Sequence, residues 1–267
     1  MAKQSELQGD FTFFSCERME SIVVLRFHDN IFRDAVSLEK RDALMTFLDR
    51  LSASEEIKVL IVESSMEKPG CEEYLDFFLR GRQRWERYTI RRFCNILNHF
   101  ILSIAGLNKM VVHTCRGDLI ALFMNVGLVC DYRIAAENTV FCNTYLDLGM
   151  LPKGGGPLFL SRLLGKGKAY EVLLLKEEIT AAEALEFGIV DRVVPVEDLG
   201  RTAIETAQGF SRRSGKTLSG IKRLVNYTVK DLADYLEFEN QEIFRIVDSP
   251  RFGDEEAAEA KPVCETR

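Results

Sequence analysis

Residues 164–194 read LGKGKAYEVLLLKEEITAAEALEFGIVDRVV, and this stretch is the most informative part of the sequence. Its runs of Ala, Glu, Leu and Lys predict helices over about 166–175 and 180–187. The β-branched residues that follow predict a strand over 190–194. Two helices and a strand within thirty-one residues indicate a chain that alternates the two kinds of element.

The same alternation extends upstream. Strands are predicted at 11–16, 21–27, 59–62, 109–114, 132–135 and 140–143, the first two forming a hairpin around the polar residues 17–20. Helices are predicted at 38–51, through most of 74–108, in an apolar run that ends at 128, from about 152 to 164, and from 199 onward. This order indicates an α/β fold. The two-strand opening and unequal spacing favour a spiral of repeated strand–strand–helix units over a doubly wound sheet.

The composition of the 267 residues narrows the class of protein. Hydrophobic residues make up 46% and charged residues 28%, as in a soluble globular protein. The net charge of −6 argues against a nucleic-acid partner, because such binding depends on basic residues. The longest apolar run, 119–130, is too short to cross a bilayer. With no secretory segment at the start, we expect a cytoplasmic protein without a membrane partner.

Cysteine and histidine usage gives no metal-site pattern. The seven cysteines are scattered without a Cys-x-x-Cys pair, which favours reduced thiols over disulfides or a metal centre. Among the three histidines, His113 lies in the apolar run 110–114. Either a structural or a catalytic role is open for it.

The ordered matches in 164–194 resemble the crotonase (enoyl-CoA hydratase/isomerase) superfamily, in which a Gly-Lys helix precedes an Ile-x-Ala-x-x-Ala helix and a Gly-Ile-Val strand. Residues 109–117 also resemble the family's Lys-Pro-Val strand ending in Asn-Gly, with Met110 and Arg116 as departures. The resemblance covers about residues 10–250. The positions that carry the match in 164–194 are Gly165, Ala169, Leu173, Ile179, Ala181, Ala184, Gly188, Ile189 and Val190.

The resemblance implies an α/β crotonase-type spiral of ββα units with a helical C-terminal extension. We expect the spiral core at 10–199, a helical oligomerisation region at 200–252, and mobile tails at 1–9 and 253–267. The implied ligand is an acyl-CoA thioester, with coenzyme A as part of the substrate and no covalently bound cofactor. The implied assembly is a homotrimer or a dimer of trimers.

Family members hold the thioester oxygen with two backbone N–H groups, which stabilise an enolate. The resemblance assigns one donor to Leu122, in a turn where Leu122 and Phe123 stand in place of glycine. The other donor lies in the loop after strand 59–62. Alignment on Gly70 makes that donor Cys71, which we prefer, whereas alignment on Leu75 makes it Glu73.

The two glutamates that activate water and deliver a proton in hydratases map to Asn125 and Tyr145. Neither side chain is a base near neutral pH. Each lost acid–base contribution costs roughly 10²–10⁴-fold in rate. We therefore expect ordinary hydratase activity to be poor.

Other residues are candidates for the missing roles. Asp147 is a possible single base for a proton shift, Lys153 a possible partner for a carboxylate or phosphate, and Tyr145 a possible hydrogen-bond donor. The alternatives are a solvated loop carboxylate, a surface lysine and a packed tyrosine. Arg33 and Ala35 occupy positions where the resemblance implies contact with coenzyme A, and guanidinium suits phosphate.

Two functions follow. The first is an acyl-CoA isomerase, lyase or decarboxylase that works through an enolate. The second is a non-catalytic acyl-CoA-binding or assembly protein that keeps the fold. The bulky Leu122–Phe123 pair favours the second, and the retained polar residues favour the first, toward which we lean.

Overall fold

The structure is a computed structural model that describes residues 7–11, 13–28, 32, 36–64, 71–81, 87–249 and 252. Within these residues the main sheet has seven strands, in the order β1 (Gly9–Asp10), β2 (Phe14–Met19), β3 (Ile22–Phe27), β4 (Val59–Ser64), β5 (Met110–Cys115), β7 (Tyr132–Ala136) and β10 (Arg192–Val194). The first three strands pair antiparallel, and every later neighbouring pair is parallel.

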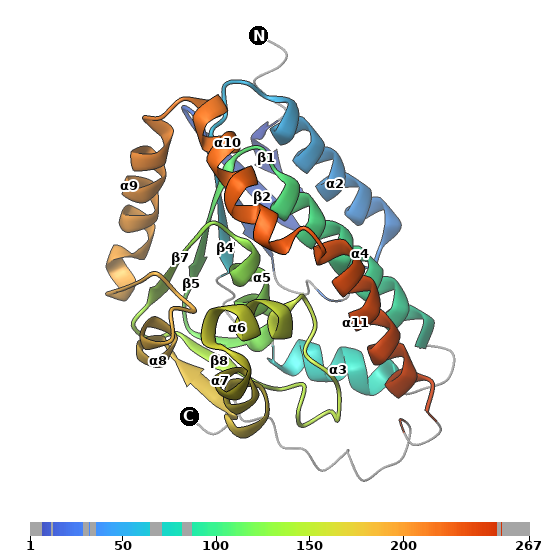
Figure 1. The fold of residues 1–267 in the computed structure, drawn as a ribbon. Helices are drawn as coiled ribbons and strands as arrows, with labels where there is room; N and C mark the ends of the chain where they lie inside the picture. Colours follow the sequence, from blue (N-terminus) through green and yellow to red (C-terminus); the bar gives the residue numbers. More distant parts are fainter. Residues whose placement is uncertain are drawn as a thin grey trace.

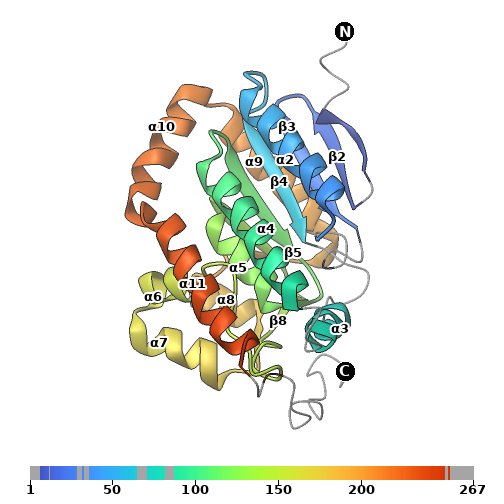
Figure 2. The ribbon, with the colours of Figure 1, turned by 90° about the vertical axis from the view of Figure 1, so that its right-hand side faces the viewer.

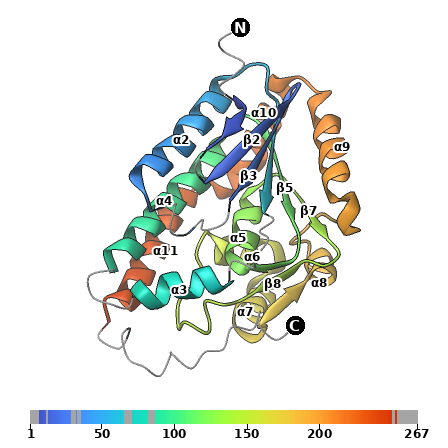
Figure 3. The same ribbon diagram turned by 180° about the vertical axis from the view of Figure 1, so that it is seen from behind.

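Both faces of the main sheet are covered by other parts of the protein. Successive side chains of a strand point to opposite faces, so each strand contributes to both cores. In β3, Val23 and Leu25 lie in the larger core, whereas Ile22 and Val24 lie in a smaller core. That smaller core is closed by α9 (Leu199–Ser211). Figures 1 and 3 show α9 on one side of the sheet, with the longer helices on the other side.

The larger core lies beneath four helices, α2 (Leu38–Ala53), α4 (Arg87–Gly106), α5 (Ala121–Val129) and α11 (Leu232–Val247). In Figure 2, α4 and α11 run side by side although their midpoints are 143 positions apart in the sequence. The remaining helical elements are α3 (Cys71–Gly81), α6 (Gly156–Leu164), α7 (Lys166–Tyr170), the π-helical turn η2 (Glu171–Leu175), α8 (Ala181–Glu186), η3 (Val196–Asp198), α10 (Gly215–Asn226) and η4 (Tyr227–Val229).

A second, smaller sheet joins the parts of the chain that flank α5. It consists of β6 (Asp118–Ile120), β8 (Val140–Cys142) and β9 (Glu178–Thr180) among the described residues. β6 and β8 are parallel, and β8 and β9 are antiparallel. Because β6 ends at Ile120 and α5 starts at Ala121, this sheet fixes where α5 begins.

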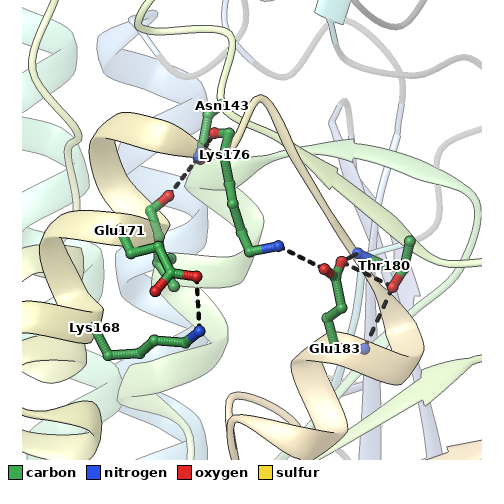
Figure 4. Close-up of polar contacts among 7 residues, drawn as sticks. Asn143, Lys168, Glu171, Lys176, Thr180 and Glu183 are labelled. Carbon is green, nitrogen blue, oxygen red and sulfur yellow. Dashed lines mark hydrogen bonds and ion pairs between the residues drawn. The ribbon is translucent and has the colours of Figure 1, made fainter.

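The segment 164–194 is held by local hydrogen bonds (Figure 4). Thr180 caps α8: its hydroxyl accepts from the Glu183 N–H, and the Glu183 carboxylate accepts from the Thr180 N–H at 3.0 Å. Lys176 forms an ion pair with Glu183 at 2.6 Å. Asn143, just after β8, donates to the carbonyls of Val172 and Lys176 at 2.8 and 2.6 Å. These contacts tie η2 and α8 to the second sheet.

Most predicted elements are present, with two kinds of difference. The predicted hairpin turn at 17–20 is shifted, because Glu17 to Met19 pair with β3 and the chain turns at Glu20, whose φ is 52°. β6 and β9 were not predicted, since three-residue strands are too short for a periodic pattern. In the part of the chain that the structure describes, no helix has the length and apolar character needed to cross a bilayer.

Candidate functional site

The start of α5 has the hydrogen-bonding capacity expected of an oxyanion donor. The side chain of Ile120, the residue before the helix, makes no capping hydrogen bond. First-turn N–H groups have no acceptor within their own helix, and the helix dipole places partial positive charge there. Leu122, the predicted donor, is in this turn and contributes to the walls of two cavities.

The smaller cavity has a volume of about 10 Å³. We call it the polar corner. It brings the predicted residues Leu122, Asn125, Tyr145 and Lys153 together at the beginning of α5. Its walls are formed by Tyr74, Ile120, Ala121, Leu122, Asn125, Cys142, Thr144, Tyr145 and Lys153.

Asn125 is 1% exposed and is already engaged with the protein. Its Nδ2 donates to the carbonyl of Lys153 at 2.9 Å. Glycine at 156 makes room for it, because a Cβ there would lie 2.4 Å from Asn125 Oδ1. The amide therefore braces the Gly-rich turn before α6, and it has no proton-transfer role at neutral pH.

Tyr145 is also buried, and its hydroxyl donates to the carbonyl of Leu173 at 2.8 Å. Burial raises the pKa of the Tyr145 phenol well above its ordinary value. The phenol is therefore neutral, and its proton is used in the hydrogen bond to the Leu173 carbonyl of η2.

Lys153 forms a buried ion pair with Glu239 of α11, with Nζ and Oε2 2.5 Å apart. Its ammonium group also donates to Asn98 Oδ1 on α4. Glu239 further accepts from the N–H groups of Gly154 and Gly155 at 3.1 and 2.9 Å. Both side chains are at most 5% exposed. Lys153 is thus neither a surface lysine nor a free cation.

Sequence reasoning missed Asn98 and Glu239. They lie 55 and 86 residues from Lys153 in the chain. Glu239 is one of many glutamates in a helical, charged region, so its spacing gives no signal. A buried position on the apolar face of α11 is the only local hint.

The larger cavity, which we call the phenylalanine cavity, has a volume of about 70 Å³. This is roughly half the volume of an engineered apolar cavity that binds benzene. Leu122 contributes to this cavity as well as to the polar corner. The walls are formed by Phe13, Phe27, Phe32, Leu44, Val62, Ser64, Phe93, Ile96, Leu97, Phe100, Leu122, Phe123 and Val126.

A serine–histidine pair lies beside the phenylalanine cavity. Ser64 Oγ is 2.8 Å from His113 Nε2, and Cys115 Sγ is 3.3 Å from His113 Nδ1. Gly127 leaves room for the ring, since a Cβ there would lie 2.6 Å from Nδ1. Burial, with a smaller effect of Arg133, lowers the pKa of His113 to about 3. A histidine with so low a pKa is a poor general base, which favours the structural role.

The other predicted residues are not gathered at the polar corner. Asp147 is half-buried in the turn after Tyr145 and is in the wall of neither cavity. Cys71 is the first residue of α3, and Glu73 accepts a hydrogen bond from the Phe32 N–H at 2.9 Å. Arg33 and Ala35, the predicted coenzyme A contacts, lie outside the described residues, as do the predicted tail at 253–267 and residues 1–6 of the predicted tail at 1–9. Within that N-terminal tail, Leu7 is buried in the larger core and Gly9 of β1 pairs with Cys16.

Comparison with known proteins identifies the family. The family model described as Enoyl-CoA hydratase/isomerase matches residues 17–250. A short-chain-enoyl-CoA hydratase of Clostridium acetobutylicum is 30% identical over 152 residues, which is 57% of this chain and 58% of that protein. A trans-2-decenoyl-[acyl-carrier-protein] isomerase of Streptococcus mutans is 27% identical over 155 residues, 58% of each chain. These matches thus span little more than half of the two relatives.

Among solved structures, an enoyl-CoA hydratase from Bacillus halodurans superimposes with a TM-score of 0.77 at 19% identity, over 91% of this chain and 98% of that one. This likeness concerns the fold. The chain belongs to the enoyl-CoA hydratase/isomerase family, as a divergent member. The predicted crotonase-type α/β fold with C-terminal helices is therefore confirmed.

Proposed function

We propose that this protein binds an acyl-CoA thioester and does not hydrate it. The observation that carries the proposal concerns the residues at the two positions where hydratases have glutamates. Asn125 and Tyr145 are neutral there, and each is hydrogen-bonded to a backbone carbonyl. A polar corner of about 10 Å³ leaves no room for a substrate double bond and an attacking water together.

Two features support thioester binding. The uncapped start of α5 offers N–H groups for the thioester oxygen. Leu122 is also part of the phenylalanine cavity, so an acyl chain held at that N–H has an apolar space beside it. The volume of about 70 Å³ suits a short chain. Coenzyme A contacts by Arg33 and Ala35, and a second donor at Cys71, remain predictions.

A second candidate is decarboxylation of a malonyl-type thioester. Lys153 places a cation beside Tyr145 and the start of α5. Loss of CO₂ breaks the bond to the carboxylate carbon and leaves its electron pair as the enolate, so no base is needed. The oxyanion donor then stabilises that enolate, and solvent supplies the proton. This reaction requires the polar corner to open.

The remaining finer predictions have no observation that favours them over these two. A one-base isomerase would need Asp147, which is not in the wall of the polar corner. Homotrimer or dimer-of-trimers assembly through residues 200–252 and a cytoplasmic location stay predictions.

The test measures binding and turnover separately. Butyryl-CoA is titrated while the melting temperature is followed. Ligand at about 100 times its Kd stabilises a protein by ~2.7 kcal/mol. We expect stabilisation by butyryl-CoA, no hydration of crotonyl-CoA above background, and no CO₂ from malonyl-CoA. Absence of any acyl-CoA effect would overturn the binding proposal, and robust hydration would overturn its second half. Release of CO₂ from malonyl-CoA above background would establish the decarboxylase instead.

A matched pair of variants locates the acyl chain. Val126→Phe fills the phenylalanine cavity, and we expect it to weaken butyryl-CoA binding more than binding of coenzyme A alone. Val225→Phe makes the same change at a position on α10 that is 62% exposed, and should leave both affinities unchanged. Equal effects of the two variants would contradict the location.

A further inference from the structure

The polar corner has about the smallest volume that can hold one water molecule. A buried water needs a cavity of roughly 10–15 Å³ and two to four polar partners. The volume here is about 10 Å³. Unlike the phenylalanine cavity, this one has four polar side chains in addition to Tyr74. They are Asn125, Thr144, Tyr145 and Lys153.

One buried acceptor at this cavity has no partner. Asn125 Oδ1 is buried and receives no hydrogen bond from any group that the structure describes. The Nδ2 of the same amide donates to the Lys153 carbonyl. An amide flip would set two oxygens against each other, so the assignment of Oδ1 is fixed by this contact. Unpartnered buried acceptors are rare in native structures, and each calls for a donor.

Hydrogen-bond donors without an acceptor among the described residues also lie at the polar corner. The Lys153 ammonium has three N–H groups, and two of them are accounted for by Asn98 and Glu239. The first turn of α5, at Ala121 and Leu122, contributes N–H groups without intrahelical acceptors. Tyr145 is not a donor here, because its hydroxyl donates to Leu173.

We propose that the polar corner is a binding site for a single ordered water molecule. The water donates to Asn125 Oδ1 and accepts from the Lys153 ammonium group and from an N–H of the first turn of α5. Three partners match the usual number for a buried water. Glu239 and Asn98 are positioning residues, since they fix the ammonium group that holds the water.

The same geometry makes this water unreactive. Both of its lone pairs face donors, and no carboxylate is among the described residues that line the cavity to remove its proton. The position at which a hydratase activates water is then a structural water site. This inference concerns the free protein and does not depend on acyl-CoA binding.

A high-resolution crystal structure of the full chain tests the inference, together with structures of two variants. We expect one density peak within hydrogen-bonding distance of both Asn125 Oδ1 and Lys153 Nζ. The peak should persist in Tyr145→Phe, whose hydroxyl is spent on Leu173, and disappear in Asn125→Leu, which removes the acceptor. An empty corner in the unmodified protein, or a peak that survives Asn125→Leu, would overturn the proposal.

A solution measurement keeps the test independent of crystals and of variant folding. In the unmodified protein we expect a nuclear Overhauser effect between a long-lived water and the amide proton of Ala121 or Leu122. The amide of Leu160, in the middle of α6 and fully buried, serves as the negative control. No water signal at either α5 amide would count against the site. Failure of acyl-CoA binding would leave this result unaffected, so the two proposals fail separately.

Discussion

Segment 164–194 and the polar corner represent two ways in which one chain relates to its family. The segment resembles the family's pattern, and its contacts are local: Thr180 and Glu183, three positions apart, form the capping box of the six-residue helix α8. The polar corner keeps the place but not the residues. Its central contact joins Lys153 to Glu239 across 86 positions.

The difference separates what maintains a fold from what performs chemistry. Helix capping and short apolar elements depend on residue types at fixed spacings, so each substitution there removes a local contact with a modest cost in stability. The side chains of a catalytic corner can be exchanged if the new set satisfies its own hydrogen bonds. Here the new set is Asn125, Tyr145 and the Lys153–Glu239 pair, which are engaged with the protein.

The largest expected effect comes from breaking the buried ion pair. Lys153→Met leaves the Glu239 carboxylate buried without its cation, which should lower the free energy of unfolding by about 3–5 kcal/mol. Lys153→Met combined with Glu239→Leu should cost less than Lys153→Met alone. Urea denaturation measures both. Arg201→Gln, which removes exposed ion pairs on α9, is the control and should have no measurable effect. A double variant as unstable as the sum of the single ones would contradict coupling.

A smaller effect is expected from crowding the polar corner. In Gly156→Ala the new Cβ would lie 2.4 and 2.5 Å from Asn125 Oδ1 and Cγ, so either the Asn125 side chain or the backbone at 156 must move. Overpacking of this kind costs about 1–3 kcal/mol. Gly167→Ala on α7 is the matched control, because nothing lies within 4 Å of its Cβ position. Equal thermal stability of the two variants would show that Asn125 can move away from position 156 at little cost.

The stability contributed by segment 164–194 should depend on pH. Glu183→Ala removes the capping box and should cost about 1 kcal/mol at neutral pH. Hydrogen bonds from Lys176 and from the Thr180 N–H hold the pKa of Glu183 down at about 2 in the folded protein. The folded-state pKa is below the unfolded-state pKa, so this stabilisation is present above about pH 4.5 and is lost as the pH falls toward 2.

The measurement for Glu183 is the difference in unfolding free energy between the two proteins, followed from neutral to acidic pH. That difference should shrink on acidification. Glu186→Ala, at an exposed position of the same helix, should show no such trend. A Glu183→Ala difference that is constant with pH would contradict the role of the ionised carboxylate.

The smallest effect is expected at Asp147. Because Asp147 is in the wall of neither cavity, Asp147→Asn should leave the Kd for butyryl-CoA unchanged. Isothermal titration calorimetry checks this against Val126→Phe, which should weaken binding. A clear loss of affinity in Asp147→Asn would return Asp147 to the site and strengthen the one-base isomerase.

Much of the fold followed from the sequence because its signals are local. The apolar run at 59–62 forms the first four residues of β4, and the periodic helix at 38–51 forms most of α2. The short strands β6 and β9 were missed, since three residues give no period and form only by pairing with β8. Strand ends also shifted where a partner strand continued the ladder.

The site followed from the sequence only in part. The resemblance located Leu122, Asn125, Tyr145 and Lys153, and these four do lie around one cavity. It could not show that the cavity is small or that Glu239 balances the charge of Lys153. Both features depend on packing between α11, α4 and the turn before α6. Pairings of this kind join distant residues by shape and charge, and no spacing in the chain records them.

The Lys153–Glu239 pair also orders events during synthesis. Residues 1–200 leave the ribosome before α11 exists, and until then the ammonium group of Lys153 has no carboxylate partner from that helix. Burial of this unpaired cation would be costly, so we expect the turn before α6 to stay in water until α11 has been made. The polar corner is completed only after α11 has been made, because Glu239 belongs to that helix.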